Sequence, residues 1–180
     1  MIVFGAHVSV SVWTLVALIA GAALSLLLYR PLARWRHWQP TATLASLLFL
    51  SVTLALAVTP GDPDPPMGLD ACIPADLPDL LFSILHTGGG LAGELLNLMF
   101  MLPLTFSLVL ATRRAWPGVV VAVLLPLAVE FIQTVVPGHY CTISDVLTNG
   151  AGALLGTAVA HRLLVRRSRA VPHRPVQSRQ

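Results

Sequence analysis

Hydrophobic positions fall into five long runs along the chain, and polar stretches separate them. Each run approaches the ~20 residues that an α-helix needs to cross a hydrocarbon core of about 30 Å. The pattern therefore predicts an all-α protein, a polytopic bundle of five transmembrane helices. The expected bounds are roughly Val8 to Tyr29, Ala42 to Thr59, Leu91 to Ala111, Val119 to Val136 and Asp145 to Val165.

The composition supports the same fold class. Of the 180 residues 56% are hydrophobic and only 11% are charged, whereas a soluble domain usually carries about 25% charged residues. We therefore expect an integral membrane protein with a single domain. Residues 60–90 form the longest polar stretch, and the segment PDLLFSILH within it predicts a short amphipathic helix on the membrane surface.

The charges indicate an orientation in the membrane. All eleven basic residues are arginine, and they gather in residues 30–36, in residues 113–114 and in the tail from Arg162. Arginine-rich short loops mark the cytoplasmic side, so the N-terminus is expected outside and the C-terminus inside. The predicted bundle then spans residues 1–165, with an outer loop at 60–90 and a disordered basic cytoplasmic tail at 166–180.

The basic tail bears on possible partners. Its arginines could touch the anionic head groups of membrane lipids, or they could serve only as a solvated topological anchor. The rest of the chain has too little basic surface to favour nucleic acid, and we expect none to bind.

Cys72 and Cys141 both lie on the predicted outer side. That compartment is oxidising in bacteria. We therefore expect a Cys72–Cys141 disulfide that ties the outer loop to the connection between the last two spans. The alternative is a pair of free, inert thiols.

Three of the predicted spans carry a polar pair near the outer end. Residues three or four apart share a helix face, and an ionised group in a bilayer is costly unless it faces a cavity or a partner. We therefore expect one shared polar pocket, open toward the outer leaflet. The pairs are Glu94 with Asn97, Glu130 with Gln133, and Asp145 with Asn149.

Each of these residues also has a simpler interpretation. Asp145 could be a helix N-cap, Asn97 and Gln133 could join neighbouring helices, and Glu94 could lie among the head groups. Glu130 is the hardest to explain in this way, because no arginine lies near it in sequence. Two carboxyl groups in one pocket, Glu130 and Asp145, would suit an acid/base pair.

The remaining candidates concern packing and metals. Gly152 and Gly156 form a GxxxG pattern that allows close helix contact, and Pro103 should bend the third span. We expect no metal or other cofactor, because His86 and His139 show no known ligand spacing with the acids.

The pattern of these residues resembles the VanZ-like family of bacterial membrane proteins. NLMFMLPLT is similar to that family's N-x5-P-L-G segment, and EFIQ followed by D-x3-N-x2-G-x3-G is similar to its E-x2-Q block and the segment after it. The resemblance covers about residues 91–156. It implies a multi-pass protein of the bacterial cell membrane, associated with resistance to teicoplanin and related lipoglycopeptides. The matching positions are Asn97, Pro103, Glu130, Gln133, Asp145, Asn149, Gly152 and Gly156.

Two positions depart from the family pattern. His139 stands where members usually carry arginine, and Thr105 stands where they usually carry glycine. Histidine can balance carboxylates or hold an anionic ligand only when it is protonated.

Three functions remain open from the sequence. The first is binding of a lipid-linked envelope precursor, or of a lipoglycopeptide tail, in the outer pocket by Glu94, Asn97, Gln133, His139 and Asn149. The second is an enzyme that uses Glu130 and Asp145 as acid and base on a lipid-linked cell-wall substrate. The third is a small proton-coupled transporter, against which the single depth of the polar residues argues.

Overall fold

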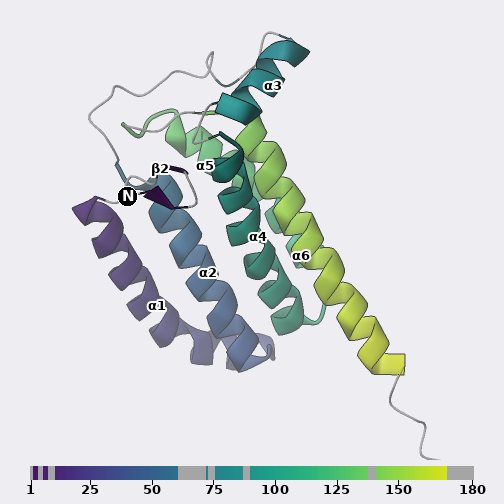
Figure 1. Ribbon diagram of the computed structural model, residues 1–180. Coiled ribbons are helices and arrows are strands. Elements are labelled where there is room, and N and C mark those ends of the chain that lie inside the picture. The colour runs from purple at the N-terminus through teal and green to yellow at the C-terminus, as the bar shows by residue number, and fades with distance from the viewer. Residues whose placement is uncertain are drawn as a thin grey trace, which may run out of the picture.

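The computed structural model (Figure 1) describes residues 2–3, 6–7, 11–60, 72, 76–86, 90–137 and 141–169. The regular structure of these residues is helical except for a pair of two-residue antiparallel strands near the N-terminus. The elements are β1 (Ile2–Val3), β2 (Ala6–His7), α1 (Val12–Arg36), α2 (Pro40–Val58), α3 (Leu77–His86), α4 (Gly90–Thr112), α5 (Trp116–Gln133) and α6 (Ile143–Arg169).

Helices α1, α2, α4 and α5 are long and apolar enough to cross a membrane, so four of the five predicted spans are confirmed as candidates. Helix α6 has the length, at 27 residues, but it is not among them. The physical reason lies in its composition, because polar residues and glycines occupy its first half and arginines its last turn. The amphipathic helix expected in the outer loop is present as α3.

The helices alternate in direction, so the chain has two distinct ends (Figure 1). The α1–α2 turn, the α4–α5 turn and the end of α6 lie at one end, and each carries arginine. We call this the arginine end. The opposite end, with the starts of α4 and α6 and the end of α5, carries the acids and is called the acidic end. The part of the tail beyond residue 169 lies outside the described residues.

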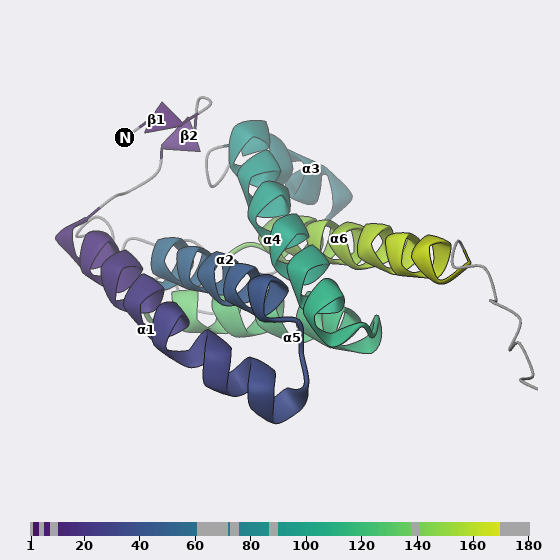
Figure 2. The same ribbon diagram turned by 90° about the horizontal axis from the view of Figure 1, so that it is seen from below.

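Helix α1 lies at one edge of the bundle and packs on α2 (Figure 2). Small and hydroxylated side chains join the two helices. The Oγ atoms of Ser25 and Ser51 are 3.1 Å apart, and the Oγ1 atoms of Thr14 and Thr59 are 2.8 Å apart. Hydroxyl groups of this kind commonly link helices in a membrane, and they leave the other faces of α1 free for lipid.

Helices α4 and α6 share the most extensive contact of the bundle. Gly152 and Gly156 lie on the face of α6 that meets α4, where an added Cβ would meet the backbone of Leu98 or of Leu102. Close approach of helices through glycine is the expected role of this pattern. Pro103 lies within α4 without ending it, and the bend expected there stays a prediction.

The distribution of polarity is that of a protein dissolved in lipid. Large apolar side chains cover the exterior, for example Val123, Leu124 and Phe131 on α5, whereas Glu94 and Glu130 are each only 5% exposed. A water-soluble fold would place these groups the other way round. The chain is therefore a multi-pass membrane protein.

Candidate functional site

The acidic end brings together the start of α4, the end of α5 and the start of α6. Side chains from these three helices form one hydrogen-bonded group, which we call the polar cluster. Its members are Glu94, Asn97, Glu130, Thr142, Asp145 and Thr148.

The start of α6 is built around Thr142. Its hydroxyl accepts a hydrogen bond from the backbone N–H of Asp145 at 3.2 Å, which is the geometry of a helix N-cap. Asp145 is therefore not the cap, and its side chain is available to the cluster. The backbone N–H of Thr142 donates to Glu130 Oε2 at 2.9 Å. In a capping box an acid of the same helix would accept that N–H, whereas here the acceptor comes from α5.

Two further hydrogen bonds join α4 to α6. Asn97 Nδ2 donates to Asp145 Oδ1 at 2.7 Å, and Thr148 Oγ1 donates to Glu94 Oε2 at 2.5 Å. Glu94 is buried within the protein, and its depth relative to the head groups stays a prediction. Asn97 does join two helices, as its simpler interpretation held, and its partner is one of the two carboxyl groups proposed for chemistry.

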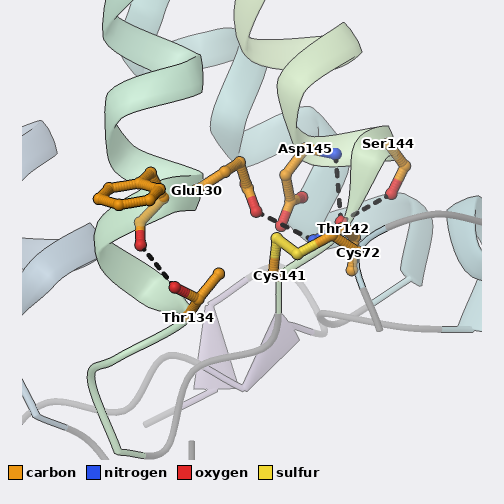
Figure 3. The surroundings of a disulfide bond; sticks show 8 residues. Cys72, Glu130, Thr134, Cys141, Thr142, Ser144 and Asp145 are labelled. Atoms are coloured by element: carbon orange, nitrogen blue, oxygen red, sulfur yellow. Dashed lines mark hydrogen bonds between the residues drawn. A yellow bond between two sulfur atoms is a disulfide. The ribbon is translucent and has the colours of Figure 1, made fainter. Parts of the chain in front are cut away.

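The carboxyl groups of Glu130 and Asp145 lie next to each other, beside Thr142 (Figure 3). They are near enough to interact electrostatically, and Asp145 interacts in the same way with Glu94. Three acids of three helices thus share one buried region.

Gln133 lies on the same helix as Glu130 but is turned toward another neighbour. Its Nε2 donates to the backbone oxygen of Ala57 at the end of α2, at 2.9 Å. Gln133 therefore joins α5 to α2, and the expected convergence of all three polar pairs is met only in part. Asn149 is buried on α6 at 7% exposure, one turn beyond Asp145.

Two buried oxygen atoms at this end lack a hydrogen-bond partner among the described residues. They are Glu130 Oε1 and Gln133 Oε1. Both are acceptors, and a buried acceptor without a donor costs about 1–3 kcal/mol. A ligand that carries hydrogen-bond donors would satisfy them.

The disulfide expected between Cys72 and Cys141 is confirmed (Figure 3). The Cα atoms of the two cysteines are 4.8 Å apart, and Cys141 is 5% exposed. Because Cys141 immediately precedes Thr142, the crosslink fixes the residue whose N–H Glu130 accepts. The connection between α2 and α3, which contains Cys72, is thus tied directly to the polar cluster.

The remaining candidates complete the comparison with the sequence. His139 lies outside the described residues, so its part in the site stays a prediction. Within the part of the chain that the structure describes, no three His, Cys, Asp or Glu side chains form a metal-binding group. The hydroxyls of Thr142 and Thr148 were missed, although T-x-x-D is a recognisable helix-start signal.

One comparison with known proteins covers the region that contains this site. The sequence model of one family, described as VanZ/LLP1, matches residues 67–165. That range is more than half of the chain and contains the whole polar cluster and both cysteines. No curated protein and no solved structure matches the chain.

Proposed function

The chain belongs to the VanZ/LLP1 family of membrane proteins, and we propose that it binds a lipid-linked envelope precursor, or the tail region of a lipoglycopeptide, at the polar cluster. The site would act at the outer leaflet of the bacterial cell membrane. Binding there would alter the response of the cell to glycopeptides such as teicoplanin, the class of drug with which VanZ-like proteins are associated.

This proposal includes a fifth span. Helix α6 is 27 residues long, and at 1.5 Å per residue it extends about 40 Å, enough for a bilayer. Leu147, Leu154 and Leu155 are exposed on its outer face, where they would meet lipid. With α6 across the membrane, the arginine end is cytoplasmic by the positive-inside rule and the polar cluster is external.

One observation carries the binding proposal. The buried acceptor oxygens of Glu130 and Gln133 have no hydrogen-bond donor among the described residues. Sugar hydroxyls and peptide N–H groups supply such donors, and lipid-linked cell-wall precursors are rich in both. Apolar side chains at the same end suit the lipid part of such a ligand. Leu77, Leu81 and Phe82 of α3 are all more than half exposed, which favours contact with a lipid surface.

The test is a pair of charge-neutral substitutions in a strain whose teicoplanin susceptibility depends on the protein. Glu130→Gln and Asp145→Asn keep the shape of each side chain and remove its acidity. We expect both to restore susceptibility toward that of the strain lacking the protein. Asp76→Asn is the matched control, because it removes an exposed acid outside the cluster and keeps the Oδ1 atom that accepts the Asp79 N–H. Unchanged susceptibility in both cluster variants would refute the proposal.

A second candidate function rests on the proximity of Glu130 and Asp145. Two carboxyl groups that share a buried site can divide into an acid and a base, and the lipid-linked precursor would then be a substrate. The two candidates differ in what co-purifies with Glu130→Gln. A binder loses the ligand in this variant, whereas an enzyme retains unconverted substrate, which mass spectrometry of the purified sample would detect.

A further inference from the structure

A cavity lies toward the arginine end, among α1, α2, α4 and α5. Its volume is about 340 Å³, and it shares no residue with the polar cluster. Leucine side chains from all four helices line it, together with Trp38, Ser46 and Ala111. A volume above about 300 Å³ is in the range of ligand sites, and the lining offers almost no polar group to a ligand.

A basic side chain lies against one of the lining residues of the cavity. Trp38, which lines it, lies under the guanidinium of Arg36 at 5.7 Å, and the same guanidinium lies 5.2 Å from the ring of Trp35. The backbone N–H of Gln39 donates to the oxygen of Ala111 at 3.1 Å. This bond holds the α1–α2 turn against the end of α4, so two arginine-bearing turns lie beside the cavity that Trp38 and Ala111 line.

The arginines of these turns have no acidic neighbours in sequence. The chain contains no Asp or Glu before Asp62, and none between Glu94 and Glu130. Unbalanced positive charge beside an apolar cavity is complementary to a molecule with an anionic head and an aliphatic tail. Basic pockets between transmembrane helices on the cytoplasmic side commonly bind lipids of this kind.

We propose that this cavity holds an acyl chain of an anionic phospholipid whose phosphate group Arg36 binds. The tail gains close dispersion contacts along the leucine-lined walls, which bulk lipid packs less completely. The ring of Trp38, which lines the cavity, orients the Arg36 guanidinium beside it. This site is independent of the function proposed for the polar cluster, because it lies toward the other end of the bundle.

Trp38 itself can report the lipid. In the background Trp13→Phe, Trp35→Phe, Trp116→Phe it is the one remaining tryptophan of the four in the chain. The protein is reconstituted into phosphatidylcholine vesicles that contain increasing fractions of brominated phosphatidylglycerol. We expect quenching of Trp38 to saturate at a low mole fraction. Brominated phosphatidylcholine should quench only in proportion to its abundance.

Two substitutions test the two parts of the site. Arg36 is exposed, so Arg36→Gln should leave the fold intact and raise the half-quenching fraction of phosphatidylglycerol about fivefold, the contribution of one arginine near the membrane surface. Ser46→Leu fills the cavity and should abolish saturable quenching. Ala128→Leu is its control, because it adds the same kind of side chain to an exposed position on α5.

The outcomes separate the possible occupants. Equal quenching by the two brominated lipids would overturn the proposal, as would an unchanged half-quenching fraction in Arg36→Gln. A stable dimer with Trp38 shielded from both lipids would overturn it in favour of a second copy of the chain. If Ser46→Leu does not fold, as judged by circular dichroism, the Arg36→Gln titration still decides the question.

Discussion

Gly152 offers the sharpest test of how the polar cluster is held together. A Cβ atom at this position would lie 2.6 Å from the backbone oxygen of Leu98 and 2.8 Å from its Cα. Both atoms belong to the backbone of α4, so no side-chain rotation can relieve the overlap. The substitution Gly152→Ala must therefore move α6 away from α4 by several tenths of an ångström.

The expected cost has two parts. Overpacking of a tight contact typically destabilises by about 1–3 kcal/mol. The same interface carries the hydrogen bonds from Asn97 to Asp145 and from Thr148 to Glu94, and each bond between membrane helices contributes about 0.6 kcal/mol on average. If both weaken as the helices separate, the total reaches about 2–4 kcal/mol.

The control is the same substitution two residues earlier. At Gly150 an added Cβ would lie 3.4 Å from the oxygen of Ala122, which is an ordinary contact. Both variants share the gain of about 0.5–1 kcal/mol that alanine brings to a helix interior, so the difference between them isolates the contact with Leu98. The measurement is the free energy of unfolding in detergent micelles, followed by circular dichroism. Equal stability of the two variants would show that α4 and α6 are not in close contact at this point.

Two other predictions follow from the packing and the crosslink. Gly118→Ala should destabilise because its Cβ would meet the side chains of Thr157 and Val109. Thr157→Ala should restore part of the loss, since the nearest obstacle is the Thr157 side chain; a double variant no better than the single one would contradict this. Cys72→Ser should lower stability by about 2–4 kcal/mol, and reducing agent should destabilise the parent protein but not the variant. A melting temperature of the parent protein that is independent of reductant would argue against the disulfide.

The sequence predicted the helices well because the membrane imposes a simple requirement. Every backbone group must find a partner inside the segment, so a long apolar run can only be a helix. The four candidate spans α1, α2, α4 and α5 follow from this rule. The same pattern predicted α6 as a fifth span, but its apolar residues are interrupted by the glycines and polar groups that meet α4, and it is not among the helices apolar enough to cross. The glycines that let α6 pack tightly on α4 also lower the hydropathy by which a span is recognised.

The acids and the asparagine of the polar cluster were predictable from the sequence, but its two threonines and the pairing of its side chains were not. The spacing of Glu94 with Asn97 and of Glu130 with Gln133 places each pair on one helix face, but it does not say which neighbour that face meets. Gln133 turns to Ala57 of α2 because α5 also packs on that helix. The partner of Glu130 is a backbone N–H, and no pattern of side chains in the sequence could indicate it.

Thr105 shows how one departure from the family pattern is accommodated. Where VanZ-like proteins usually have glycine, its hydroxyl donates to the backbone oxygen of Ala153 on α6 at 2.8 Å, and also to that of Met101 one turn earlier in α4. The added side chain fits because the facing residue is Gly156, whose missing Cβ would lie 2.5 Å from Thr105 Oγ1. At this position of α4, a hydroxyl group therefore donates a hydrogen bond to α6. The spacing of α4 and α6, on which the hydrogen bonds of the polar cluster depend, is thereby fixed by Gly156 together with Thr105.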